Sequence, residues 1–427
     1  MNKVVLAYSG GLDTSVAVAW LKEQFGVEVV TLTVDLGGGS LREGVEARAI
    51  SAGASRAYVV DARERFVTDF VWPHLQANAL YQGAYPLATA LARPLIAQLL
   101  VEVAAKEGAD AVAHGCTGKG NDQVRFDVAT HALNPSLEVV APMRVGMGLT
   151  RDQEIDYAAE RGIEIPITKA SPYSIDVNLW GRSCETGVLE DPWVTPPADA
   201  YEWTVAPGDA PEPVELTVEF EGGIPVALDG ERLGAVELVE RLHELGGAHG
   251  VGRIDHVEDR LVGIKSREIY EAPAAAILHD AHRALEGLTL SRDTLRFNRL
   301  VADELSRLVY DGLWFSALSR DLRGYVASSQ RVVSGEVRMR LDHGQAVVVG
   351  RRSPLSLYDK SLATYDEGDA FDHASAVGFI EIFGLPLRVE AARHGAVGKF
   401  HGAAWSWTEP LLEHLPTTVE DPEPAAV

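Results

Sequence analysis

The stretch Ala7–Ser15, which reads AYSGGLDTS, constrains the fold of this chain more than any other. It follows the apolar run Val4–Leu6 and precedes a helix-like segment, the order of a strand, a tight turn and a helix. Paired glycines let a backbone approach an anion, and a helix N-terminus directs free N–H groups at it. Hydroxyls at Ser9, Thr14 and Ser15 favour a phosphate site over a plain turn. The commonest nucleotide loop, G-x-x-x-x-G-K-[ST], is absent from this stretch.

Alternating strand and helix signals continue through the first third of the chain. Strands are predicted at Val27–Val34, Ala57–Val60, Ala111–Ala113 and Leu137–Ala141, and a helix is predicted to begin at Pro94. Repeated βα units indicate an α/β fold with a parallel sheet. Ligands in such sheets bind at the carboxyl ends of the strands, so the first loop should lie at that edge.

The pattern changes near residue 168. Residues 171–197 are predicted to be loop-rich, and hairpins are predicted within 214–228 and 335–349. Long helices are predicted at 274–286 and 292–311. We therefore expect a parallel-sheet domain at 1–168, a second, α+β domain at 169–365, and a C-terminal segment with a disordered acidic tail at 366–427.

Composition excludes several classes of protein. The net charge of −24 argues against nucleic acid as a partner, because phosphate backbones require a basic surface. Two cysteines, Cys116 and Cys184, fit a reducing cytoplasm without disulfides. We expect a cytoplasmic protein with no signal peptide and no membrane span, because the apolar stretches are short and interrupted.

A second polar loop spans His114–Phe126 and reads HGCTGKGNDQVRF. Its density of glycines, charges and amides exceeds what a simple turn needs. Asp122 is suited to accept from an α-ammonium group, and Thr117 and Asn121 to bond a carboxylate. Arg125 is suited to clamp a carboxylate with two hydrogen bonds. This loop predicts a substrate with both ammonium and carboxylate groups.

Together the two loops resemble those of argininosuccinate synthase, within the N-type ATP pyrophosphatase (PP-loop) superfamily. The resemblance extends from residue 3 to about residue 388 and includes further matching motifs, which are SPYSIDxNL at 171–179, GVGRID at 250–255, VEDR at 257–260, KSR at 265–267 and YExP at 270–273. It implies that residues 1–168 form an ATP-binding, adenine-nucleotide α-hydrolase-like domain, that 169–365 form the synthetase domain, and that 366–427 include an oligomerisation segment. It also implies an AMP-forming carbon–nitrogen ligase of arginine biosynthesis that uses ATP with Mg²⁺, condenses citrulline with aspartate, and is a homotetramer.

The resemblance also implies roles for individual residues. Asp13 and Asp122 carry over as catalytic residues. The ATP-binding positions are Ala7, Tyr8, Ser9, Gly10, Gly11, Leu12, Asp13, Thr14, Ser15, Val34 and Gly115. Aspartate-binding positions are Thr117, Asn121 and Asp122, and citrulline-binding positions are Tyr85, Asn121, Arg125, Ser174, Ser183, Glu258 and Tyr270. No protein ligand to a metal is assigned. Glu258 and Tyr270 come from the second domain, so the site is expected between the two domains.

One position departs from the family pattern. Many members carry a Gly-Thr-Ser run whose serine contacts citrulline, whereas this chain has Ala90 there, and Thr89 is the candidate substitute. Three alternatives stay open at this point. They are another PP-loop ligase or tRNA-modifying enzyme, a relative acting on a different ureido or amino substrate, and a non-catalytic nucleotide-binding protein. The acidic composition and the two polar loops disfavour the tRNA enzyme and the non-catalytic protein.

Overall fold

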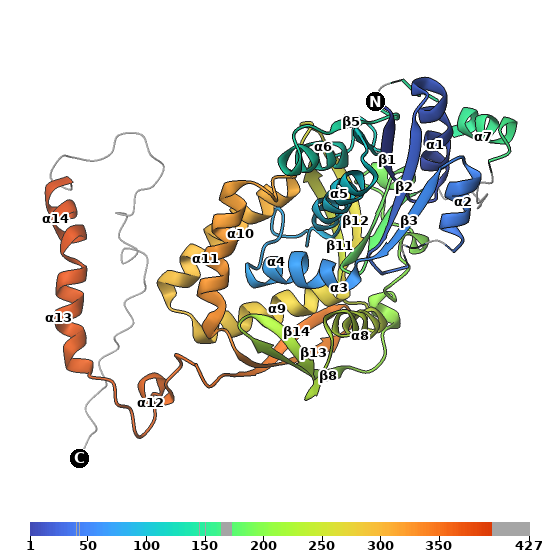
Figure 1. The fold of residues 1–427 in the computed structure, drawn as a ribbon. Coiled ribbons are helices and arrows are strands. Elements are labelled where there is room, and N and C mark those ends of the chain that lie inside the picture. Colours follow the sequence, from blue (N-terminus) through green and yellow to red (C-terminus); the bar gives the residue numbers. More distant parts are fainter. Residues whose placement is uncertain (40, 42, 145, 150, 164–172, 395–427) are drawn as a thin grey trace, which may run out of the picture. The chain divides into compact units, whose positions relative to one another are not determined.

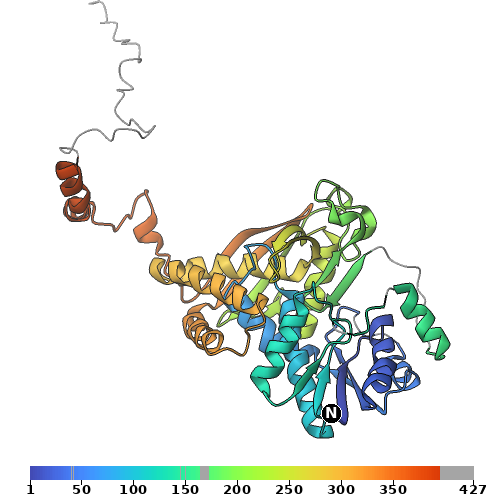
Figure 2. The same ribbon diagram turned by 90° about the horizontal axis from the view of Figure 1, so that it is seen from above.

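A five-stranded parallel sheet forms the centre of the first part of the chain in this computed structural model (Figures 1 and 2). The structure describes residues 1–394 except 40, 42, 145, 150 and 164–172. The strand order is β3–β2–β1–β4–β5, with bounds β1 Lys3–Ala7, β2 Glu28–Asp35, β3 Arg56–Asp61, β4 Ala111–Ala113 and β5 Glu138–Val140. All four pairings are parallel, which confirms the predicted α/β class.

Helices cover both faces of this sheet (Figure 1). One face packs against α1 (Leu12–Phe25), α2 (Val45–Ser51) and α7 (Arg151–Glu160). The other packs against α5 (Ala88–Glu107) and α6 (Asp122–Leu133). Two apolar cores therefore hold the sheet, and its carboxyl edge is left to the loops that follow β1, β2 and β4.

Helix α5 begins at Ala88, so the prediction that Pro94 begins it is wrong. Pro94 is fully packed inside the helix, where its fixed φ suits the helix and burial of the surrounding turn outweighs the lost N–H bond. Within the described residues, α5 alone is long and apolar enough by composition to cross a membrane, but 61% of that window is buried in the fold. A short helical run precedes it, formed by α3 (Arg63–Phe66), a π-helical turn (Val67–Val71) and α4 (Trp72–Gln76).

Two antiparallel sheets follow. The first has the order β10–β9–β8–β13–β14 and the second β11–β12–β7–β6. Their strands are β6 Ser174–Asn178, β7 Gly181–Glu185, β8 Val214–Glu221, β9 Ile224–Leu228, β10 Glu231–Arg232, β11 Arg253–Asp259, β12 Lys265–Glu271, β13 Gly335–Asp342 and β14 Gln345–Arg352. Both predicted hairpins are confirmed. The loop-rich prediction for 171–197 is wrong where β6 and β7 form a hairpin, because polar residues there serve one face of the second sheet.

Helices complete this part of the chain and extend beyond it. Their bounds are α8 Ala235–Ala248, α9 Pro273–Thr289, α10 Arg292–Tyr310, α11 Ala317–Ser329, α12 Lys360–Ala363, α13 His373–Phe383 and α14 Leu385–His394, with 3₁₀ turns at Gly187–Glu190, Ala198–Ala200, Pro207–Asp209 and Gln330–Val332. Residues Met1–Tyr358 form one compact unit, and a second unit begins at Asp359. The predicted domain boundaries stay predictions, and the tail from 395 lies outside the described residues.

Candidate active site

The loop after β1 has the geometry of an anion site. Gly10 takes φ +71°, a left-handed conformation that favours glycine. Gly11 is the N-cap of α1, and no side chain caps the first turn of that helix. The N-terminal N–H groups and the positive end of the helix dipole are therefore directed at the loop. Asp13 lies in the same turn with its side chain exposed.

Hydrogen bonds of hydroxyl groups stabilise this loop. Tyr8 Oη and Ser15 Oγ are 2.8 Å apart, and Ser9 Oγ and Thr14 Oγ1 are 3.2 Å apart. The Thr33 hydroxyl on β2 donates to the Tyr8 carbonyl over 2.8 Å. The predicted ATP-binding residues of this stretch therefore form one contiguous, internally bonded turn.

The second polar loop lies against the first. A Cβ placed on Gly115 would lie 3.2 Å from Thr14 Cγ2, so only a residue without a side chain fits comfortably there. His114 anchors the loop, since its Nε2 lies 2.8 Å from Asp127 Oδ1 on α6 and its Nδ1 accepts from the Cys116 N–H over 3.2 Å. Both loops follow adjacent strands at the carboxyl edge, where the sequence predicts the nucleotide.

Asp122 lies between two arginines. Its Oδ2 is 2.7 Å from Arg93 Nη2, and its Oδ1 is 2.9 Å from Arg125 Nη1. Burial opposes ionisation of this carboxyl, but the two guanidinium charges outweigh it and lower the pKa of Asp122 to about 2. Arg93 also contacts Asp176 on β6, which joins the parallel-sheet part of the chain to the second antiparallel sheet.

Glu258 is the acceptor for two tyrosine hydroxyls. Tyr270 donates to its Oε2 over 2.6 Å, and Tyr310 donates to its Oε1 over 2.5 Å. Asn121 donates to the Tyr310 hydroxyl over 2.8 Å, while its Oδ1 accepts from the Leu261 N–H over 2.9 Å. Burial and the charge of Glu258 raise the pKa values of both tyrosines, which remain neutral donors.

Two opposite charges in this network lack a full set of partners. Glu258 is 3% exposed and has no ion-pair partner among the described residues. Arg125 is 4% exposed, and its Nη2 has no hydrogen-bond partner in the part of the chain that the structure describes. Arg125 Nε donates to the Tyr310 carbonyl over 2.9 Å, so one tyrosine links the two charged groups. A ligand bearing both an ammonium and a carboxylate group would complete both.

The second antiparallel sheet brings the distant predicted residues onto one face. Asp176 lies opposite Ser183 on β7, and Ser183 lies opposite Tyr270 on β12. Ser174 and Glu258 lie an even number of residues along their strands from this row, so their side chains share the same face. Four of the predicted citrulline-binding residues are therefore assembled by strand register.

Tyr85 joins the network by stacking. Its ring lies 4.2 Å from that of Tyr270, with an interplanar angle of 10°. Its hydroxyl accepts from the Thr89 N–H over 3.0 Å, and Ala90 on the same helix is fully buried. The methyl group of Ala90 thus fills core space, and the predicted substitution of its missing hydroxyl by Thr89 stays a prediction.

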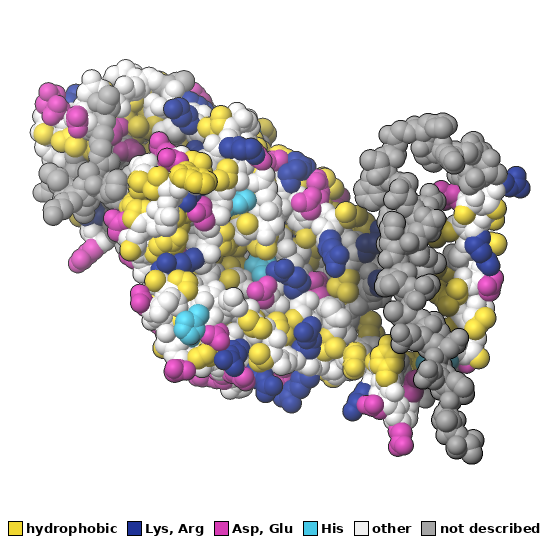
Figure 3. Space-filling model, turned by 180° about the vertical axis from the view of Figure 1, so that it is seen from behind, with side chains coloured by type: hydrophobic (Ala, Val, Ile, Leu, Met, Phe, Trp, Pro, Cys, Tyr) yellow, Lys and Arg dark blue, Asp and Glu magenta, His cyan; other side chains and the backbone are white. Residues whose placement is uncertain are grey.

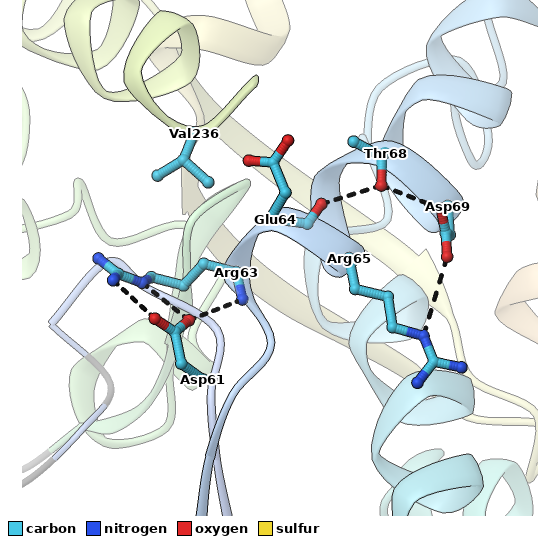
Figure 4. Close-up of a pocket in the computed structure, with 7 residues that line it drawn as sticks. All are labelled: Asp61, Arg63, Glu64, Arg65, Thr68, Asp69 and Val236. Atoms are coloured by element: carbon cyan, nitrogen blue, oxygen red, sulfur yellow. Dashed lines mark hydrogen bonds and ion pairs between the residues drawn. The ribbon is translucent and has the colours of Figure 1, made fainter. Parts of the chain in front are cut away.

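Surface features elsewhere do not compete with this site. In a hollow beside α3 both arginines are paired, with Arg63 Nη2 2.8 Å from Asp61 Oδ2 and Arg65 Nε 3.8 Å from Asp69 Oδ2 (Figure 4). On the face seen in Figure 3, basic side chains are mixed with acidic ones and form no continuous basic surface. The hollow contains none of the predicted site residues.

Comparison with known proteins identifies the family. The model described as the arginosuccinate synthase N-terminal HUP domain matches residues 3–164, and that of the arginosuccinate synthase C-terminal domain matches residues 173–390. The chain belongs to the argininosuccinate synthase family. Members are ATP-dependent ligases that condense citrulline with aspartate, so the predicted function, reaction class and ATP use are confirmed.

Relatives named argininosuccinate synthase match nearly end to end. That of Symbiobacterium thermophilum is 57% identical over 393 residues, which is 92% of this chain and 98% of that protein. That of Gloeobacter violaceus is 58% identical over 392 residues, which is 91% of this chain and 98% of that protein. A solved NAD⁺ synthetase from Burkholderia pseudomallei is 19% identical, covers 40% of this chain and 70% of its own, and has a TM-score of 0.27, too low for any argument.

Sequence reasoning on this argininosuccinate synthase family member missed several residues of the network. Arg93 and Tyr310 contact predicted site residues directly, and Asp176 contacts Arg93. In the sequence, Arg93 is a single charge within an apolar helix, and Tyr310 is an apolar residue at the end of another predicted helix. A buried charge within an otherwise apolar helix was the available signal for Arg93, since such groups need a partner.

Proposed function

We propose that this chain joins citrulline to aspartate through a citrullyl-adenylate, and that Glu258 and Arg125 hold citrulline by its ammonium and carboxylate groups. One observation carries the proposal. Among the described residues, Glu258 is a buried carboxylate without a cation, Arg125 is a buried guanidinium with an unused donor, and Tyr310 bonds to both. An α-amino acid supplies, in one molecule, an ammonium group for the carboxylate and a carboxylate acceptor for the unused donor.

The chemistry explains why ATP is needed. A ureido carbon is a poor electrophile because nitrogen lone pairs feed into it, and its oxygen is a poor leaving group. The ureido oxygen attacks the α-phosphorus, the bond to the bridging oxygen breaks, and pyrophosphate leaves with that electron pair. The aspartate amine then attacks the activated carbon, loses a proton, and displaces AMP. The protein contributes positioning and electrostatic stabilisation, with no covalent enzyme intermediate.

Each group of residues has a task in this scheme. The loop of residues 7–15, together with Val34 and Gly115, binds ATP so that its α-phosphate faces citrulline. Thr117, Asn121 and Asp122 receive aspartate, and Asp122 is kept ionised by its two arginines. Further citrulline contacts are assigned to Tyr85, Asn121, Ser174, Ser183 and Tyr270.

Mg²⁺ is proposed to accompany the triphosphate. Magnesium prefers oxygen ligands and binds substrate phosphates together with one or two carboxylates and water. The exposed carboxylate of Asp13, in the first turn of α1, is of the type required. The ion would offset negative charge on the departing pyrophosphate.

A homotetramer in the cytoplasm is also proposed. Helix α13 buries none of its side chains, and Val377, Phe379, Ile380, Ile382 and Phe383 are each at least 63% exposed. Exposed apolar surface of this extent marks a contact with another chain. By composition the apolar stretch 379–383 could equally be a buried strand within one subunit, but the structure shows a helix there. Light scattering on the full chain, compared with Phe379→Ser/Ile382→Ser, tests the assembly, and an unchanged mass would contradict it.

Labelled citrulline tests the reaction. Protein is incubated with ATP, Mg²⁺, aspartate and citrulline carrying ¹⁸O in its ureido group, and AMP is analysed by mass spectrometry. The label is expected in AMP, because the ureido oxygen becomes an oxygen of the adenylate phosphate. AMP release without citrulline, or release of unlabelled AMP, would contradict the proposal.

A further inference from the structure

An arginine outside the predicted site lies against the phosphate loop. Arg48 is on α2, which packs beside the loop, and a Cβ placed on Gly10 would lie 3.4 Å from Arg48 Nη2 and 2.9 Å from Val45 Cγ2. The absence of a side chain at Gly10 is therefore what allows the guanidinium to approach the loop backbone. Nothing in the motif AYSGGLDTS indicates this residue, since it follows 38 positions after Gly10.

The guanidinium of Arg48 has few partners among the described residues. Nη1 donates to the Glu43 carbonyl over 2.6 Å, whereas Nε is buried without a hydrogen-bond partner. No carboxylate lies within ion-pair distance of Arg48 among the described residues. Arg63, on a nearby element, is by contrast paired with Asp61. In a chain with a net charge of −24, an unpaired cation beside the uncapped N-terminus of α1 concentrates positive potential on one loop.

We propose that Arg48 binds the β- and γ-phosphates of ATP and the pyrophosphate that leaves. The inference rests on the proposed function, in which the loop holds that end of the nucleotide. As the bond between the α-phosphorus and the bridging oxygen breaks, negative charge grows on the pyrophosphate, and Arg48 stabilises it. A purely structural arginine, holding α2 through the Glu43 carbonyl, would affect all ligands alike.

Calorimetric titration of the full chain with MgATP, Mg-pyrophosphate and AMP tests this role. Arg48→Met is expected to weaken ATP and pyrophosphate binding by about 10- to 100-fold, the range for a lost charge-assisted hydrogen bond, with AMP changed less than about twofold. Arg48→Lys should recover part of the loss, because it restores the charge without the fork. Lys22→Met is the matched control, since Lys22 also donates to a backbone carbonyl, that of Gly53, over 2.9 Å.

Two outcomes would overturn the proposal. Pyrophosphate binding by Arg48→Met equal to that of the wild type is one, and equal losses for AMP and pyrophosphate is the other. Lys22→Met should bind all three ligands as the wild type does. Failure of the proposed function is recognised separately, as AMP release by the wild-type protein that does not depend on citrulline.

Discussion

The phosphate loop (residues 7–15) and the network of polar residues around Glu258 and Arg125 bind their ligands in different ways. The loop is nine consecutive residues, and it offers backbone N–H groups, small hydroxyls and a helix dipole. The network is built from α5, α6, β11, β12 and α10, and one of its hydrogen bonds joins Asn121 to Tyr310, 189 residues away. A local motif can therefore define the reaction class, whereas choice of substrate depends on contacts that only the folded chain creates.

The two regions also differ in electrostatics. Residues 7–15 themselves form the anion site from glycine geometry and a helix end, and the one cation that we propose there, Arg48, comes from α2. In the network, Arg93 and Arg125 are balanced by Asp122 and Asp176, and Glu258 and one nitrogen of Arg125 are left for a ligand. Loop variants should therefore fail through backbone geometry, and network variants through lost charge.

The largest effect is expected for Gly10→Val. Valine at φ +71° is strained, and its Cβ would lie 2.9 Å from Val45 Cγ2, so the loop must shift. We expect kcat/KM to fall by at least about 100-fold, as when preorganised donors are lost. Gly26→Val is the matched control, because Gly26 has φ +65° at the other end of α1 with nothing within 4 Å. Equal activity of the two variants, at similar Tm, would remove the loop from the mechanism.

A smaller, selective effect is expected for Asp122→Asn. The amide keeps the shape but loses the charge that Arg93 and Arg125 hold ionised. We expect KM for aspartate to rise by about 10- to 100-fold, while KM for ATP changes less than about threefold. Steady-state kinetics with each substrate varied gives both values, and Tm reports whether the buried arginines destabilise the fold. Equal changes for aspartate and ATP would contradict the assignment of Asp122.

Tyr310→Phe tests the link between the two charges. It removes hydroxyl bonds to Asn121 and Glu258 but keeps the ring, which stacks on Tyr81 at 3.6 Å. We expect citrulline binding to lose about 1–2 kcal/mol of free energy, seen as a rise of about 5- to 30-fold in KM for citrulline. Tyr325→Phe, which loses a 2.8 Å bond to Asn298 away from the site, should leave this KM unchanged. A rise shared by both variants would indicate a general loss of stability.

Two buried histidines predict how the stability of the protein depends on pH. Burial lowers the pKa of His74 and of His279 to about 3, whereas the unfolded chain titrates near 6.5. The unfolded state binds more protons between these values, so stability falls as pH drops from about 6.5 towards 3, by up to about 1.4 kcal/mol per pH unit for each histidine. Urea unfolding of His279→Gln should show a shallower dependence between pH 6.5 and 5. An unchanged slope would contradict the buried neutral state of His279.

Sequence reasoning succeeded where signals are local and failed where packing decides. The parallel sheet, both C-terminal hairpins and the position of the loop follow from apolar patterns and turn residues over short windows. The start of α5 was predicted wrongly at Pro94, because a buried helix tolerates an internal proline that an exposed helix would not. The apolar run 379–383 fits a strand or a helix equally by composition, and the structure shows a helix.

The sequence by itself determined the phosphate loop, the α/β class and the argininosuccinate synthase family, because these depend on glycine conformations and hydrogen bonds within a few residues. The tertiary structure alone decided that Arg93 joins Asp122 to Asp176, that Tyr310 links Arg125 to Glu258, and that Arg48 lies beside Gly10. These contacts join charged and polar groups whose positions along the chain carry no common period. Their cause is burial, which obliges each such group to find a partner wherever the fold brings one within reach.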